Sequence, residues 1–79
     1  MIRLTKHAEQ RATQRGLQLA WIEAAIAAPD WVSVDEDPTL AHSFKAIAEN
    51  GNRVLNVVHR SFGADIIVVT AYFDRGARR

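Results

Sequence analysis

Three β-forming segments fill the second half of the chain and are separated by turn signals. They span Leu40–Glu49, Arg53–Arg60 and Asp65–Asp74 and are rich in Val, Ile, Phe and Tyr. The dipeptides between them, Asn50-Gly51 and Phe62-Gly63, each bring a glycine to a point where a hairpin must turn. This pattern predicts an antiparallel sheet that ends in the strand Asp65–Asp74.

A shorter strand signal precedes these three segments. Trp31-Val-Ser-Val lies within residues 30–35, and the acidic residues 35–37 and Pro38 that follow it are typical of a loop. The predicted antiparallel sheet therefore has three to four strands.

Two helices are predicted ahead of the sheet. Thr5 is a suitable N-cap and Gly16 a suitable C′ residue for a helix from about Lys6 to Arg15. A second helix runs from 19 to 27 and ends before Pro29. Its apolar positions, Leu19, Ile22 and Ile26, are predicted to be its main contribution to the core. The fold class is therefore α+β, with both N-terminal helices packed on the sheet.

The composition fits one small globular domain. The chain has 79 residues, of which 48% are hydrophobic and 24% charged, which is too apolar for intrinsic disorder. We expect residues 1–79 to form a single domain that is ordered over about 1–74, with 75–79 as a mobile tail.

The absence of cysteine bears on location. Small secreted domains commonly rely on disulfides, so this composition favours a reducing cytoplasm. Charges interrupt the first residues, where a signal peptide would be apolar, and no apolar run approaches the length of a membrane span. We therefore expect a cytoplasmic protein with no membrane partner.

The charges are unevenly distributed although the formal net charge is only +1. Basic residues gather within 6–15 and 75–79, and acidic residues within 35–37. This distribution permits the basic face that nucleic-acid binding needs, although solvated surface charge produces the same pattern.

A strand register follows if both turns are two-residue loops. His42 then lies opposite His59, and Leu55 opposite Thr70. One face would carry His42, Phe44, Ala46, Leu55, Val57, His59, Ile66, Val68, Thr70 and Tyr72. Both faces are apolar and the helices can cover only one, so the other is predicted to be a shallow groove, a dimer surface or a partner-binding platform.

His7, Arg11 and Arg15 are spaced by four residues and form a ladder along one side of the first helix. Arginine offers a planar fork of donors and histidine titrates near neutral pH, so the ladder suits phosphate. The alternative is a solvated helix face. Thr70 and Tyr72 place a hydroxyl pair on the most apolar strand, where they either contact a substrate or serve as ordinary strand formers.

The predicted neighbours His42 and His59 are further candidates, as a general acid/base pair or as part of a metal site. Zinc normally takes three or four protein ligands, and no third ligand stands at a recognisable spacing. We therefore predict neither a metal nor another cofactor.

The order of several motifs resembles a known bacterial family. Leu4-Thr-Lys-His-Ala is followed by Arg11, by Arg15-Gly16-Leu17, by a helix ending at Pro29, and by a last strand reading Ile67-Val-Val-Thr-Ala-Tyr. Together these resemble, over almost the whole chain, the family catalogued as domain of unknown function 4258. That family is similar to the superfamily of bacterial ribonuclease toxins with RelE-like and barnase-like domains, in which helices pack on an antiparallel sheet.

The resemblance implies metal-independent RNA cleavage, in which the ribose 2′-hydroxyl attacks the adjacent phosphate. This reaction needs a base, positive charge on the phosphate and an acid for the leaving oxygen. By the resemblance, His7 is the candidate base or acid, Arg11 and Arg15 would hold the phosphate, and Thr70 and Tyr72 would position the substrate. His59 matches no family position.

Three functions are open on the sequence. The first is a toxin-like endoribonuclease that acts on RNA and is inhibited by a cognate antitoxin or immunity protein. The second is a non-catalytic module, monomer or homodimer, that uses its second apolar sheet face for a protein partner or for self-association. The third is RNA binding without cleavage.

Overall fold

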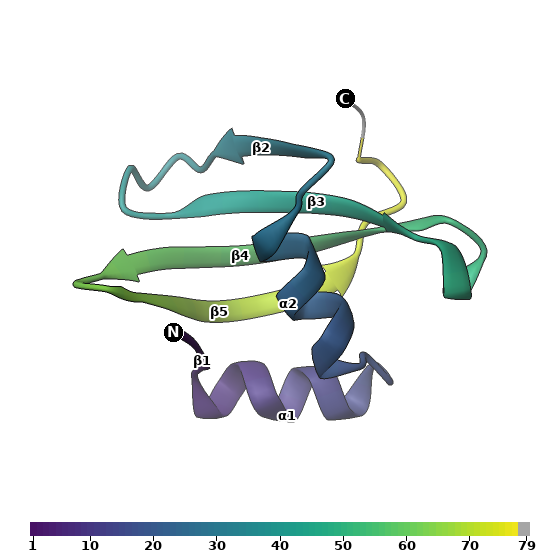
Figure 1. The fold of residues 1–79 in the computed structure, drawn as a ribbon, viewed down its shortest axis with the longest axis horizontal. Helices are drawn as coiled ribbons and strands as arrows, with labels where there is room; N and C mark the ends of the chain where they lie inside the picture. Colours follow the sequence, from purple (N-terminus) through teal and green to yellow (C-terminus); the bar gives the residue numbers. More distant parts are fainter. Residues whose placement is uncertain (78–79) are drawn as a thin grey trace.

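The computed structural model describes residues 1–77, which form two helices on one face of a five-stranded sheet (Figure 1). The elements in chain order are β1 (Ile2–Leu4), α1 (Lys6–Gln14), α2 (Leu19–Ala27), β2 (Trp31–Val34), β3 (Ala41–Ile47), the 3-10 turn η1 (Ala48–Asn50), β4 (Arg53–Phe62) and β5 (Asp65–Phe73). The strand order is β1-β5-β4-β3-β2. Figure 1 shows α2 crossing the face of the sheet and α1 lying beside β5.

The α+β class is confirmed, but the prediction of a three- to four-stranded antiparallel sheet is wrong. β1 adds a fifth strand, and it pairs with β5 in parallel, with Ile2 opposite Ile66 and Leu4 opposite Val68. The other strand pairs are antiparallel. A three-residue strand is too short to show an alternating pattern, and its pairing with residues 66–68 depends on a contact far away in sequence.

The first helix begins and ends as its cap residues predict. The side chain of Thr5 accepts a hydrogen bond from the backbone N–H of Ala8 at 3.0 Å, as an N-cap should. At the other end Gly16 adopts a φ of +66°, a left-handed conformation that glycine reaches without strain. The chain can therefore turn sharply into α2.

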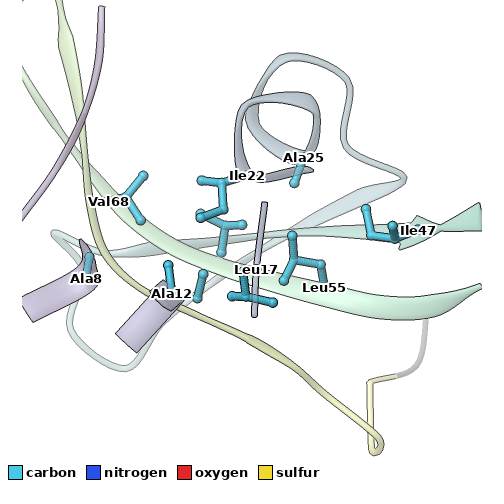
Figure 2. Close-up of a cluster of buried hydrophobic side chains, with 10 residues drawn as sticks. Ala8, Ala12, Leu17, Ile22, Ala25, Ile47, Leu55 and Val68 are labelled. Atoms are coloured by element: carbon cyan, nitrogen blue, oxygen red, sulfur yellow. The ribbon is translucent and has the colours of Figure 1, made fainter. Parts of the chain in front are cut away.

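The core lies between the helices and the sheet (Figure 2). Its buried members are Ala8, Ala12, Leu17, Ile22, Ala25, Ile47, Leu55, Val57, Val68 and Ala71. Because α1 contributes only two alanines to this cluster, it can lie close to β5. Leu19 was predicted to be in the core, but it is 54% exposed, because it stands at the first residue of α2, where the helix has not yet reached the sheet.

The predicted register is wrong by one residue between β3 and β4 and by two to three residues between β4 and β5. The β3–β4 connection is the five-residue stretch 48–52, which includes η1, so His42 lies opposite Val58 and Ala41 opposite His59. A bulge between β4 and β5 then shifts the pairing again after Val58. A one-residue shift moves a whole strand to the other face, so Leu55, Val57, His59 and Val68 do not share a face with His42.

The described end of the chain makes a turn. The backbone N–H of Gly76 donates to the Asp74 carboxylate at 3.0 Å, and the N–H of Ala77 donates to the Asp74 carbonyl. Residues 78 and 79 of the predicted tail lie outside the described residues. Within residues 1–77, neither helix has the length and apolar character to cross a membrane.

Candidate functional site

Two rows of side chains cross the open face, by which we mean the sheet face opposite the helices. In the first row Trp31, Phe44, Asn56 and Tyr72 lie opposite one another on successive strands. In the second row Ser33, His42, Val58 and Thr70 do the same. Cross-strand neighbours on one face are close enough to interact. The register therefore brings His42, Asn56, Thr70 and Tyr72 together.

A hydrogen-bond chain links these residues. Nε2 of His42 lies 2.7 Å from the Asp35 carboxylate, and its Nδ1 lies 3.0 Å from Oδ1 of Asn56. Nδ2 of Asn56 donates to the Tyr72 hydroxyl at 3.1 Å and to the Asp74 carboxylate at 3.4 Å. Asn56 is only 2% exposed. We call the connected residues Asp35, His42, Asn56, Tyr72 and Asp74 the open-face network.

The network orients the Asn56 amide. The Asp74 carboxylate can only accept, so the amide nitrogen of Asn56 faces it and the amide oxygen faces His42. The two ring nitrogens of His42 therefore face two oxygen atoms, one on Asp35 and one on Asn56. The hydrogen bond with His42 lowers the pKa of Asp35, and the backbone N–H of Asp37 lowers it further.

An aromatic stack supports the His42 ring. The planes of Trp31 and Phe44 are within 8°, with centroids 4.7 Å apart, and those of Phe44 and His42 are within 16°, with centroids 6.0 Å apart. Stacked rings restrict one another's orientation. His42 is thus held by the stack at its ring face and by Asp35 and Asn56 at its ring nitrogens.

Arg15 joins α1 to the same site. Its Nη1 donates to the Ala71 carbonyl at 2.8 Å and to the Thr70 hydroxyl at 3.4 Å, and its guanidinium carbon lies 5.9 Å from the centre of the Tyr72 ring. β1 pairs only with residues 66–68 of β5, so the Ala71 carbonyl lies on a stretch of strand edge that β1 does not reach. Arg15 supplies the donor that a neighbouring strand would otherwise give.

His7 and Arg11 lie one turn apart on the exposed side of α1. Nε of Arg11 lies 3.5 Å from Nε2 of His7, and its Nη1 donates to Gln14 at 3.3 Å. The bond from Arg11 requires Nε2 of His7 to be unprotonated. At 3.5 Å this hydrogen bond is long, so a ligand can replace it with little loss of free energy.

His59 lies on the opposite face of the sheet from His42. Its Nε2 is 2.7 Å from the hydroxyl of Ser43, which is only 3% exposed. Partial burial lowers the pKa of His59, and the charge of His42 lowers it further. The predicted pairing of His42 with His59 is wrong, because the five-residue connection places the two rings on different faces.

The lowered pKa of His59 predicts a pH dependence of stability. Because the folded protein holds this proton less tightly than the unfolded chain, the free energy of unfolding should fall as the pH drops below 6.5, the ordinary value. His59→Gln keeps a partner for Ser43 but does not titrate. Denaturant unfolding at about pH 7.5 and about pH 5.5 should show a smaller loss of stability in His59→Gln than in the wild type. Equal losses would contradict the assignment.

A comparison with known protein families gives one match. The model of a family described as a domain of unknown function, DUF4258, matches residues 4–73. The chain belongs to the DUF4258 family. Searches among curated proteins and among solved structures each gave no match.

In this DUF4258 chain the predicted site residues fall into three groups. Arg15, Thr70 and Tyr72 are in contact, and His42 is joined to Tyr72 through Asn56. His7 and Arg11 lie one turn apart on α1, and within residues 1–77 no hydrogen bond joins them to the other groups. His59 is apart from both groups. No three His, Cys, Asp or Glu side chains are arranged as metal ligands within these residues.

Sequence reasoning missed Asn56, Asp35 and Asp74. Asn56 had a signal, since it is the one polar residue in the run Val54–Val58, and a buried amide needs hydrogen-bond partners. The predicted register was wrong and therefore did not place those partners beside Asn56. The two aspartates stand outside the strands, so their approach to the network could not be inferred from strand pattern.

Proposed function

We propose that this chain is a toxin-like, metal-independent endoribonuclease whose site lies where α1 meets β5. The observation that supports it most is the contact of Arg15 with Thr70 and Tyr72. It brings a cation at the end of α1 to the Thr70 hydroxyl and to the Tyr72 ring of the last strand. A fold relationship to RelE-like and barnase-like toxins, a cytoplasmic location and an inhibiting antitoxin or immunity protein are parts of the same proposal.

The phosphate would be held by groups from both elements. Arg15 uses only Nη1 for its bonds to β5, so its Nε and Nη2 are left to donate to a phosphate oxygen. Within residues 1–77 the Tyr72 hydroxyl accepts from Asn56 and has no acceptor for its own proton, which is a further donor. Arg11 adds positive charge on the same helix.

The proton would be exchanged by His7. The 2′-oxygen forms a bond to phosphorus while the bond from phosphorus to the 5′-oxygen breaks, which leaves a 2′,3′-cyclic phosphate and a 5′-hydroxyl. Nε2 of His7 takes the 2′-hydroxyl proton, since its lone pair faces Arg11, and the leaving oxygen takes a proton from water. His42 and Asn56 act as positioning residues, because they hold the Tyr72 hydroxyl in place.

The test is a cleavage assay with the purified protein. Labelled single-stranded RNA of several sequences is incubated with the wild type and excess chelator, and the product ends are identified. We expect fragments that end in a 2′,3′-cyclic phosphate, and 2′-O-methyl RNA of the same sequence should stay intact because its nucleophile is blocked. No cleavage of any RNA, or cleavage that also cuts the methylated strand, would contradict the proposal.

A second candidate function is self-association, which the edge strand β2 favours. β2 is the last strand of the sheet order, and its residues Val32 and Val34 are 54% and 77% exposed. An exposed apolar edge strand is a template for pairing with another chain. In this proposal two copies would pair β2 with β2 across a two-fold axis.

Val34→Lys should abolish such a dimer. Sedimentation at several concentrations is expected to show a dimer for the wild type and a monomer for Val34→Lys, because lysine on an edge strand opposes pairing. Leu19→Lys is the matched control, since Leu19 is 54% exposed but lies on α2. His7→Ala should leave the dimer unchanged. A wild type that stays monomeric at high concentration would contradict this second function.

A further inference from the structure

A hollow of about 430 Å³ adjoins the Arg15 and Tyr72 side chains. It lies between the end of α1, the start of α2 and the connection of β3 to β4. The side chains around it that matter here are Arg15, Trp21, Asn50, Arg53, Tyr72 and Phe73. Its volume is within the range of pockets that hold small organic ligands.

The hollow is positively charged. Its lining includes two guanidinium groups and no carboxylate, and neither Arg15 nor Arg53 forms an ion pair within residues 1–77. Two acids stand close to the lining among the described residues: the Glu49 carboxylate accepts the indole N–H of Trp21 at 3.1 Å, and the Asp74 carboxylate accepts from Asn56 at 3.4 Å. Two guanidinium groups in one concave wall attract an anion such as a phosphate.

Aromatic rings form the other walls. The guanidinium carbon of Arg53 lies 4.6 Å from the centre of the Phe73 ring, and the rings of Trp21 and Phe73 meet edge to face at 6.0 Å. Arg53 is therefore held over the Phe73 ring by its guanidinium carbon, and its N–H donors can still bond to a ligand. Planar groups of this kind stack on nucleobases, and Asn50 adds an amide that can read a base edge.

We infer that this hollow binds one nucleoside monophosphate unit of an RNA strand, next to the phosphate that is cleaved. This inference rests on the proposed function, and it adds a substrate subsite to the proposed cleavage site. Arg15 and Tyr72 line the hollow and also belong to the proposed cleavage site, so a strand that lies across Tyr72 places a neighbouring nucleotide here. Arg53 contacts that nucleotide and not the reacting atoms.

The experiment measures binding without cleavage, so it is independent of whether the chain cuts RNA. A 2′-O-methyl hexanucleotide, adenosine 5′-monophosphate, adenosine and inorganic phosphate are titrated into wild type, Arg53→Gln and Arg60→Ala. Arg60 is an exposed arginine seven residues further along β4, roughly 23 Å away at the rise of a strand. Its loss removes the same charge from a different place.

We expect the hexanucleotide to bind most tightly and the mononucleotide to bind more tightly than adenosine or phosphate. Arg53→Gln should weaken both nucleotides at least about tenfold, the size of a charge-assisted hydrogen bond, while Arg60→Ala changes the mononucleotide affinity less than about twofold. If Arg53→Gln fails to fold, Arg53→Lys takes its place and should show a several-fold loss. Equal losses for the Arg53 and Arg60 variants, or a hexanucleotide that binds no better than the mononucleotide, would overturn the inference.

Discussion

Replacing His7 with alanine should lower the rate of RNA cleavage by about 100- to 10,000-fold, the usual contribution of a positioned acid or base. His7 is exposed, and among residues 1–77 its Nε2 has a hydrogen bond only with Arg11, at 3.5 Å, so its loss removes a proton acceptor without disturbing the core. The measurement is the single-turnover rate on labelled RNA in excess chelator, with circular dichroism to show that the fold is retained.

The matched control is Gln10→Ala, a change on the same exposed helix. The Gln10 side chain makes no hydrogen bond among residues 1–77 and lies outside the proposed site, so the cleavage rate of Gln10→Ala should stay close to that of the wild type. Full activity in His7→Ala would show that another group exchanges the proton. An equal loss in Gln10→Ala would show that the effect comes from the helix and not from the imidazole.

Replacing Leu55 with alanine should cost about 2–5 kcal/mol in the free energy of unfolding. Leu55 has no exposed surface and sits at the middle of the core cluster between β4 and the helices (Figure 2). A chain of 79 residues has a total stability of about 4–12 kcal/mol. The variant should therefore lose a large share of the total stability, which denaturant unfolding measures directly.

Two other variants test whether the loss of stability in Leu55→Ala comes from core packing. Leu55→Met nearly conserves the volume and should cost less than about 1.5 kcal/mol. Val34→Ala removes methyl groups from a side chain that is 77% exposed and should change the stability by less than about 0.5 kcal/mol. If Leu55→Ala were no more costly than Val34→Ala, the core would not be centred where the structure has it.

The sequence determined the elements whose signals are local. Thr5 and Gly16 mark the ends of α1 because a cap acts within a few residues of itself, and the bounds of α2 follow from its apolar run and Pro29. The four later strands also lie where Val- and Ile-rich segments predict them. Within the candidate site, the ladder of His7 and Arg11 follows from helical spacing, so the sequence predicts it as well.

The tertiary structure alone decided how these elements meet. A five-residue connection and a bulge set the strand register, and since side chains alternate along a strand, this choice placed Asn56 with His42 and Tyr72 and moved His59 to the other face. The parallel pairing of β1, and the reach of Arg15 to Thr70, join residues more than fifty positions apart. Such contacts depend on how the whole core packs, because no local preference distinguishes one register from the next.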